Sequence, residues 1–268
     1  SVTAFAQKMN KAEVKQLQNF VAQTSEKGGT NGEALKIVDM NAPSTWEGIT
    51  VENGRVVAID WKDKHLAGTL NLSGFTALKK VDVSRNALTS LNVEGDAALV
   101  ELNASRNKLS ELTLGGNAAL NKLTIYRNRL TDIDVTGTPM LENLNCSNNL
   151  FVELSVANAT RLKSLNCQGC HLEALDVHGC ATLKNLYCGY NKLSSINLSG
   201  VSGLTNLNVD DNEIDNLIIS GLPSLSTFIC SDNRMTNLVL RNCNNLIDLV
   251  CSYNNLTSFS VDNCPNLQ

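Results

Sequence analysis

The chain has few aromatic residues and almost balanced charge, and both features limit what it can do. Of its 268 residues, 4% are Phe, Trp or Tyr, and the formal net charge is −4. So small a negative balance offers no general attraction for nucleic acid, and we expect no nucleic-acid partner. No apolar run approaches the length that crosses a bilayer, so we also expect no membrane span.

The short motifs common in enzymes are missing as well. There is no G-x-S-x-G or H-E-x-x-H segment and no phosphate-cradling glycine loop, and the histidines are His65, His171 and His178. Asp210 and Asp211 are adjacent, but neighbours on a strand point to different sides and do not form an acid–base pair. We therefore expect a non-catalytic protein without a cofactor.

What the sequence does contain is a repeat. From Leu78 to Asn266 it consists of nine consecutive units of 21 residues without an insertion. Position 1 is Leu in every unit, and positions 4, 11, 14 and 16 are always apolar. Position 9 is Asn except in one unit, where Cys170 replaces it, and an imperfect unit at 56–77 precedes the series. Self-similarity at a fixed period indicates a solenoid.

The spacing within a unit predicts one coil. Apolar residues at positions 4 and 6 alternate with polar ones, as in a strand with one buried face, and positions 14 and 16 repeat this pattern. Position 18 is always Gly or Asn, which most readily adopt positive φ, so a turn is expected there. The Asn at position 9 is expected to pair with backbone groups where the chain bends, forming a ladder through stacked coils.

The unit L-x-x-L-x-C/V-x-x-N-x-L-x-x-L-x-V-x-G resembles the leucine-rich repeat over residues 56–268. Its length, with Cys at position 6, is similar to the internalin J-like, Cys-ladder repeat class of bacterial surface and secreted proteins. The resemblance implies an α/β fold by the convention of that family, mostly β. The implied architecture is a right-handed solenoid of ten coils with a parallel concave sheet and an N-terminal helical cap.

Residues 1–55 have a different pattern and are the expected cap. Asn10 is a suitable N-cap for a helix, and an apolar stripe runs from Val14 to Val21. The segment Trp46–Thr50 is similar to the cap of longer leucine-rich-repeat ectodomains. Caps of that family usually carry cysteines, whereas this chain has none before residue 146, so we expect the cap to close by packing alone.

The expected solenoid has three parts: 56–77 is the first irregular repeat, 78–266 holds the nine regular repeats, and 267–268 begins a further one. The ninth repeat keeps its apolar positions, although solenoids normally end in a capping unit. This predicts either a longer natural protein or a homodimer formed through the C-terminal coil.

The N-terminus predicts export. The chain starts at Ser1, and Ala4-Phe5-Ala6 has the small-x-small form that precedes a signal-peptidase cut, with Gln7 as the mature start. Together with the family resemblance, this favours a secreted or cell-surface protein whose signal peptide has been removed.

Nine cysteines in an exported protein would ordinarily predict disulfides. Five of them share position 6, however, where side chains of stacked coils lie parallel and about 4.8 Å apart, too splayed for a relaxed bridge. We therefore expect buried free thiols. Cys167 and Cys170 with His171 and His178 are the one candidate zinc set, but they do not converge, so no metal site is expected.

Positions 3, 5, 7 and the adjacent position 8 are expected to face outward on the concave side. Position 8 changes from basic to acidic along the chain, and all four tyrosines fall at position 5, 7 or 8. Arg and Tyr dominate binding hot spots. The predicted ligand-binding residues are Arg85, Arg106, Arg127, Tyr126, Tyr187, Tyr190, Asp211, Asp232 and Tyr253.

We interpret this face as a recognition surface for a protein or a glycan, on a non-catalytic module at a bacterial cell surface. The tyrosines could stack on sugar rings, and the arginines would suit carboxylates or sulfates. Taken singly, each residue is equally compatible with a solvated strand face. The alternative function is a structural, self-assembling surface protein that uses the C-terminal coil.

Overall fold

The computed structural model describes residues 8–267, in two compact units that span Ser1–Leu130 and Thr131–Gln268. The expected cleavage segment Ala4-Phe5-Ala6 with Gln7, and the last residue Gln268, lie outside the described residues. Within residues 8–267, no helix is both long and apolar enough to cross a membrane.

The first unit opens with a helical cap, made of α1 (Lys11–Val21), the short α2 (Asn31–Ala34) and the 3₁₀ helix η1 (Pro43–Thr45). Asn10 caps α1 as expected, since its side chain accepts hydrogen bonds from the N–H groups of Ala12 and Glu13. The buried face of α1 includes Phe20, whose ring stacks on that of Trp61 in the first repeat at 5.6 Å between centroids.

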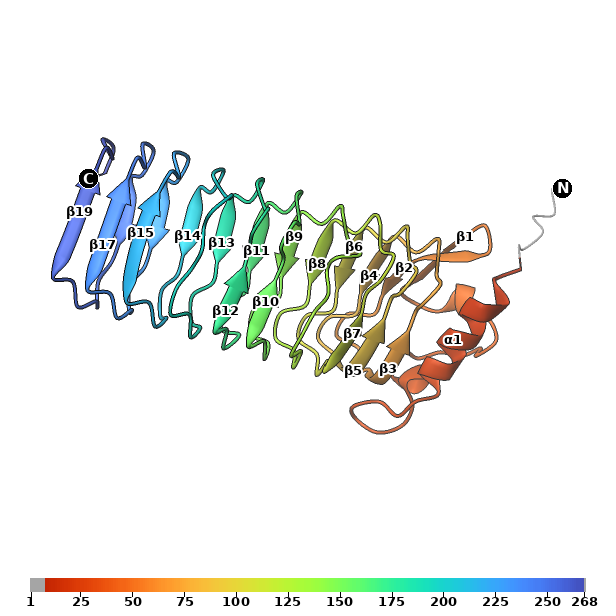
Figure 1. The fold of residues 1–268 in the computed structure, drawn as a ribbon. Coiled ribbons are helices and arrows are strands. Elements are labelled where there is room, and N and C mark those ends of the chain that lie inside the picture. Colours follow the sequence, from red (N-terminus) through yellow and green to blue (C-terminus); the bar gives the residue numbers. More distant parts are fainter. Residues whose placement is uncertain (1–7, 268) are drawn as a thin grey trace. The chain divides into compact units, whose positions relative to one another are not determined.

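The strands of the first unit form two layers on opposite sides of the coils (Figure 1). One layer follows the order β1 (Ile49–Glu52), β2 (Arg55–Asp60), β4 (Lys80–Asp82), β6 (Glu101–Asn103) and β8 (Lys122–Thr124). Only the β1–β2 pair is antiparallel. The other layer consists of parallel β3 (Ala67–Asn71), β5 (Ala87–Asn92) and β7 (Glu111–Thr113).

The second unit has the same two kinds of strand. Its first layer is parallel and holds β9 (Asn143–Asn145), β11 (Ser164–Asn166), β13 (Asn185–Tyr187), β14 (Asn206–Asn208), β16 (Thr227–Ile229) and β18 (Asp248–Val250). Its second layer consists of the pair β10 (Glu153–Ser155) and β12 (Ala174–Asp176), and of the triplet β15 (Asn216–Ser220), β17 (Asn237–Arg241) and β19 (Ser258–Asp262).

Strand register confirms that like positions of successive repeats stack within each unit. Leu102 pairs with Val81 on one side and with Leu123 on the other, and in the second unit Leu186 pairs with Leu165 and Leu207. The expected fold class, a mostly β solenoid of stacked parallel coils with few helices, is therefore confirmed. The hairpin β1–β2 joins residues on both sides of the expected cap boundary at residue 55, and that boundary stays a prediction.

The expected asparagine ladder is present. Asn107 Nδ2 donates to the carbonyl of Ala104 in its own coil at 3.1 Å and to that of Val83 in the preceding coil at 3.0 Å. Asn107 Oδ1 accepts from the N–H of Leu88, also in the preceding coil, at 2.9 Å. The same three-way pattern is found at Asn128, Asn191, Asn212, Asn233 and Asn254.

Cys170 interrupts this ladder. Its Sγ lies 3.3 Å from the carbonyl oxygen of Cys146, so the thiol takes over one donor role of the amide. A thiol has no amide oxygen, however, and the N–H of Phe151 therefore lacks the acceptor that position 9 supplies to the other coils.

The cysteines are free thiols, all within the described residues, and all are buried except the half-buried Cys251. Burial raises the pKa of the Cys170 thiol to about 11 and that of Cys188 to about 12. They therefore pack as small apolar side chains, as the register predicts. Within residues 8–267, no group of three His, Cys, Asp or Glu side chains is arranged to hold a metal ion.

The expectation that the cap closes by packing alone is wrong, because buried polar contacts hold it as well. The carboxylate of the buried Glu13 accepts from Arg55 Nε at 2.6 Å and from the N–H of Val56 at 2.9 Å. Asn31, also buried, donates to the carbonyls of Phe20 and Ala67. These charge-assisted and amide bonds take the place of the cysteines that the resemblance implied.

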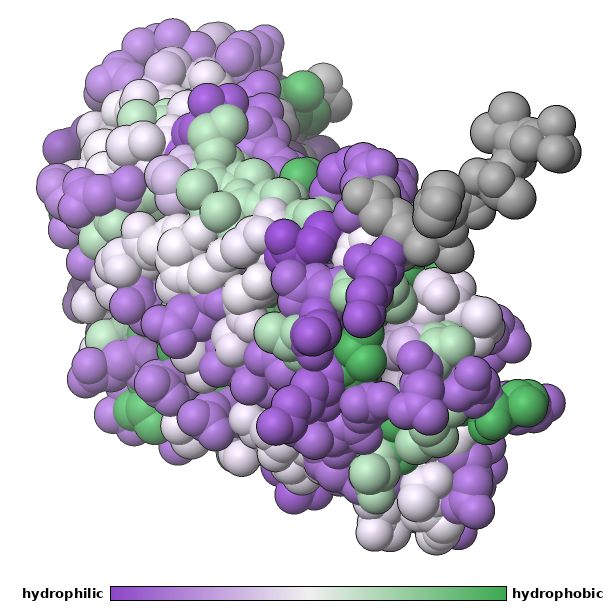
Figure 2. Space-filling model, turned by 90° about the vertical axis from the view of Figure 1, so that its right-hand side faces the viewer, coloured by the Kyte–Doolittle hydropathy of each residue, from purple (hydrophilic) through white to green (hydrophobic). Residues whose placement is uncertain are grey.

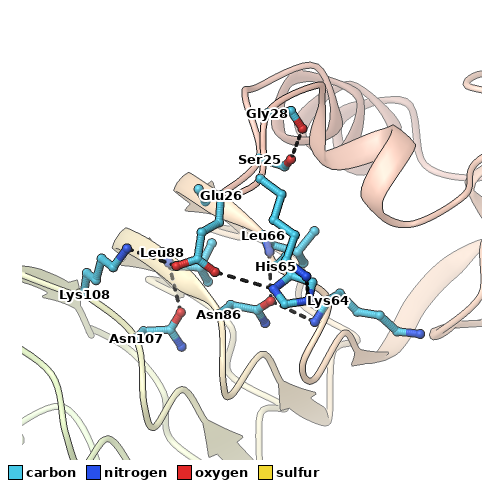
Figure 3. Close-up of polar contacts among 12 residues, drawn as sticks. Ser25, Glu26, Gly28, Lys64, His65, Leu66, Asn86, Leu88, Asn107 and Lys108 are labelled. Atoms are coloured by element: carbon cyan, nitrogen blue, oxygen red, sulfur yellow. Dashed lines mark hydrogen bonds and ion pairs between the residues drawn. The ribbon is translucent and has the colours of Figure 1, made fainter.

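The loop after α1 makes a second polar contact with the repeats (Figure 3). Glu26 accepts from Lys108 Nζ at 3.1 Å and lies 3.6 Å from His65 Nδ1. The hydrogen bond from Lys108 is the main reason why the pKa of Glu26 is lowered. Seen from the cap side, the surface is mostly hydrophilic, with hydrophobic residues in small separate patches (Figure 2).

A buried carboxylate lies between the first coils. Asp96, at position 19, is 0% exposed, and neither of its carboxylate oxygens has a hydrogen-bond partner of good geometry among the described residues. Burial raises its pKa to about 7, and the nearby N–H groups of Phe75 and Gly74 offset this only in part. In the next coil the same position is Asn117, whose amide donates to the carbonyl of Val93 at 2.7 Å.

We expect Asp96→Asn to stabilise the protein at alkaline pH. Because the folded pKa of about 7 lies above the ordinary 3.8, the folded state binds more protons between these values, and the free energy of unfolding falls as pH rises through that window. In urea unfolding, the free energy of unfolding of the variant should exceed that of the unaltered protein by about 2–4 kcal/mol at pH 8 and by much less at pH 5. A gain that does not change with pH would contradict this account.

Candidate functional site

The predicted ligand residues at position 8 lie in a turn. The strands end at position 5, and every position-8 residue from Arg85 to Tyr253 has φ between +49° and +64°. Where a further coil follows in the same unit, the position-8 N–H donates to the position-7 carbonyl of that coil, as from Arg106 to Tyr126 at 2.8 Å and from Tyr190 to Asp210 at 2.9 Å. Position 8 thus forms a regular column at the rim of the strand layer in each unit.

This backbone conformation is unfavourable for most of the residues found there. The left-handed region costs an L-residue about 1–2 kcal/mol, and Gly, Asn and Asp tolerate it best. Asn148, Gly169, Asp211 and Asp232 have the residue types best suited to it, whereas three arginines and two tyrosines occupy the other coils. Folding alone would therefore favour Gly, Asn or Asp over the arginines and tyrosines found at this position.

In the first unit the column is basic. Arg85 and Arg127 are exposed and Arg106 is half-buried, and none of the three forms an ion pair with another described residue. The Arg106 guanidinium lies over the ring of Tyr126, 5.8 Å from its centroid, and its Nε is 3.4 Å from the phenol oxygen. This hydrogen bond, followed by the charges of Arg106 and Arg85, lowers the pKa of Tyr126.

In the second unit the column is aromatic and acidic. The side chains of Tyr190 and Tyr253 are 57% and 81% exposed, and Asp211 and Asp232 are exposed as well. Tyr187 lies half-buried on β13. The pKa of Tyr190 is raised, chiefly by the charge of Asp210. The structure therefore places these predicted residues together on one rim, with surplus negative charge.

Two residues of this surface, Gly189 and Asp210, were not predicted from the sequence as part of it. Gly189 directly precedes Tyr190, and Asp210 lies next to Tyr190. Position 7 could have indicated these two residues, because Ser recurs at that position and Gly189 is the one glycine found at it among the nine repeats.

The hollows of the surface lie elsewhere. One of about 390 Å³ in the second unit is lined by Val135, Pro139 and Ala157, and one of about 560 Å³ in the cap is lined by Met9, Val14 and Pro43. Neither of these two is lined by a predicted ligand residue. Most of the predicted ligand residues are exposed, which suits a macromolecule better than an enclosed small molecule.

Comparison with known proteins identifies the fold. No family model and no curated protein matches the chain. Among solved structures it is similar to YopM from Yersinia enterocolitica WA-314, with a TM-score of 0.55 and 27% identity, over 72% of this chain and 45% of that one. It is also similar to the functional domain of InlJ from Listeria monocytogenes, which includes a cysteine ladder, with a TM-score of 0.54 and 21% identity, over 91% and 62%.

A third similar structure is that of a TLR13–ssRNA13 complex, with a TM-score of 0.56 and 23% identity, over 68% of this chain and 32% of that one. The chain spans less than two thirds of the length of each of these proteins. The similarities, together with the repeat register, support a leucine-rich-repeat solenoid fold.

Replacing an arginine of the position-8 column by glycine tests whether the left-handed backbone at that position costs stability. We expect Arg85→Gly to raise the free energy of unfolding by about 0.5–1 kcal/mol, since glycine adopts positive φ without the steric cost. The matched control is Arg129→Gly, because Arg129 is exposed and is not among the residues with positive φ. The free energy of unfolding of this control should fall by about 0.5–1 kcal/mol, since glycine adds conformational entropy to the unfolded chain. Equal effects of the two variants in chemical denaturation would refute the strain argument.

Proposed function

We propose that the protein is a non-catalytic recognition module that binds a protein or a glycan on the concave, strand-lined side of its coils. The observation that carries this proposal is the use of Arg and Tyr at a left-handed turn position where Gly or Asn would fold better. Arg and Tyr are also among the residues that contribute most to binding hot spots.

The composition of the surface supports the choice of partner. Tyr187 lies on β13 between the asparagines Asn166 and Asn208 of the flanking strands, and Asn206 Nδ2 donates to Asn185 Oδ1 at 2.7 Å. Amides and phenols offer both donors and acceptors, which suits sugar hydroxyls and peptide groups alike. The arginine column of the first unit offers forked donors for carboxylates or sulfates.

We also propose that the protein acts outside the cytoplasm, secreted or at a bacterial cell surface. The similarity of the repeats to those of bacterial surface proteins supports this. A cofactor, a nucleic-acid partner and catalysis play no part in the proposal.

The test is binding by the double variant Tyr187→Ala/Tyr190→Ala. A glycan array and a pull-down from host and bacterial extracts would first identify a ligand for the unaltered chain. We then expect the double variant to bind it about 2 kcal/mol or more weakly, with unchanged unfolding, since both rings are at least partly exposed. Unchanged affinity would exclude this surface as the binding site, and binding of single-stranded RNA alone would exclude the proposed class of partner.

A second candidate function is self-assembly through the C-terminal coil. Phe259 and Val261 on β19 are 50% and 41% exposed, although the same positions of β17 are buried. Two such faces could pair into a homodimer. Sedimentation that depends on protein concentration in the absence of any ligand would favour this function, and a monomer at all concentrations would exclude it.

A further inference from the structure

The arginines at position 8 of the first unit carry hydrogen-bond donors that the described residues leave unused. Arg85, Arg106 and Arg127 occupy this position in three successive coils. Among residues 8–267, no group accepts a hydrogen bond from the side chain of Arg85 or Arg127. The Arg106 side chain donates there only through Nε, to the phenol oxygen of Tyr126 at 3.4 Å. The terminal NH₂ groups of all three guanidinium groups are therefore available to an external acceptor.

Other charged groups of the same strand layer are engaged within the protein. Lys80 and Lys122 lie 3.2 and 2.9 Å from the two carboxylate oxygens of Glu101. Both carboxylate oxygens of Asp82 accept hydrogen bonds from neutral groups of neighbouring residues. No ion pair within residues 8–267 offsets the charge of the position-8 arginines. This column therefore attracts an anion from outside the fold.

A carboxylate at one end of the column shows where an anion is held best. In the irregular first repeat Asp63 corresponds to position 8, since its φ is +55° and its N–H donates to the Ser84 carbonyl at 2.9 Å. Asp63 is exposed and repels an anion, and this repulsion falls with distance. The strongest attraction is therefore expected at Arg106 and Arg127, which lie farther from Asp63 along the column.

Strand register sets the spacing of the arginines. The strands β4, β6 and β8 pair in register, and the N–H of Arg106 donates to the Tyr126 carbonyl at 2.8 Å, so the coils stay hydrogen-bonded up to position 8. Hydrogen-bonded strands lie about 4.8 Å apart. The Arg106 guanidinium also lies over the Tyr126 ring, 5.8 Å from its centroid, which restricts its orientation. Two neighbouring guanidinium groups can therefore contact one anionic group of a ligand.

The number of terminal oxygens distinguishes the anions that such a pair can bind. One guanidinium group binds two oxygens side by side, so a single arginine uses both oxygens of a carboxylate. The phosphodiester of a nucleic acid likewise has two terminal oxygens. A sulfate ester has three, so two arginines can share it. A glycan that carries sulfates on successive sugars therefore matches a column of arginines.

We propose that Arg85, Arg106 and Arg127, with Tyr126, bind the sulfate esters of a sulfated glycan, and that neighbouring arginines share a sulfate. This inference rests on the proposed function, in which the protein recognises a protein or a glycan, and it names the chemical class of the ligand at the first unit. Tyr126 holds the Arg106 guanidinium in place, and the terminal NH₂ groups of the arginines donate to the sulfate oxygens.

The test uses the full chain and a chondroitin sulfate hexasaccharide as the probe. The matched control ligand is the chondroitin hexasaccharide without sulfates, which keeps the same carboxylates. In isothermal titration calorimetry we expect the sulfated probe to bind about tenfold or more tightly than its control, because each sulfate adds charge-assisted hydrogen bonds. Equal binding of the two hexasaccharides would overturn the proposal.

Variants then locate the site. Arg106→Gln and the exposed Arg127→Gln should each weaken binding of the sulfated probe about tenfold, with unchanged urea unfolding for Arg127→Gln. Arg106→Lys keeps the charge but loses the forked donors, so it should also weaken binding. The control Lys15→Gln removes one positive charge at an exposed position of α1 and should have no effect. Unchanged binding by Arg127→Gln or Arg106→Lys, or an equal loss with Lys15→Gln, would overturn the assignment.

Two further ligands test the choice of a sulfated glycan. A phosphoserine peptide presents three terminal oxygens on a protein, and a single-stranded RNA presents repeated phosphodiesters. We expect both to bind more weakly than the sulfated hexasaccharide, and tighter binding of either would overturn the choice.

The outcomes also separate this inference from the proposed function, whose test lies in the second unit. If the variant Tyr187→Ala/Tyr190→Ala loses its identified ligand while the sulfated hexasaccharide does not bind, the sulfate site is wrong and the recognition function stands. If the hexasaccharide binds at the arginines and the tyrosine variant keeps full affinity for the identified ligand, the sulfate site stands and the tyrosine surface is excluded.

Discussion

A buried amide that links one coil to the coil before it is the interaction on which the structure depends. Each position-9 asparagine of the ladder satisfies two carbonyls and one N–H, and two of these three groups belong to the preceding coil. Backbone groups at a bend cannot pair within a sheet, and leaving them buried and unpaired would cost about 1–3 kcal/mol each. The ladder therefore both stabilises the bend and fixes the 21-residue register.

Because the register is fixed, side chains at the same position of successive repeats lie next to one another on the surface. Because the chain leaves the strand through a left-handed residue in every coil, the side chains at position 8 form a column, whatever their type. Folding constrains the backbone there but leaves the side chain free, so the column can carry arginines in the first unit and tyrosines with aspartates in the second. Stability is supplied by the buried positions, and the rim is available for the recognition that we propose.

The sequence alone predicted the elements that recur in every repeat, because nine copies average out the peculiarities of any one. The strand positions, the asparagine ladder and the positive φ of turn residues such as Gly95 and Asn158 followed from periodicity. Single departures from the pattern could not be predicted. Arg and Tyr give no sign of a left-handed backbone, and the burial of Asp96 or the packing of Asp210 against Gly189 depends on how side chains of adjacent coils meet.

Amide hydrogen exchange at position 11 tests the role of the ladder most directly. The N–H groups of Leu172, Leu193 and Ile214 each donate to an asparagine Oδ1, whereas that of Phe151 faces Cys170 and lacks this acceptor. We expect Phe151 to exchange at least tenfold faster than these three amides, and Cys170→Asn to slow it to their rate. Equal protection of all four amides in the unaltered protein, or no change at Phe151 in the variant, would contradict the account.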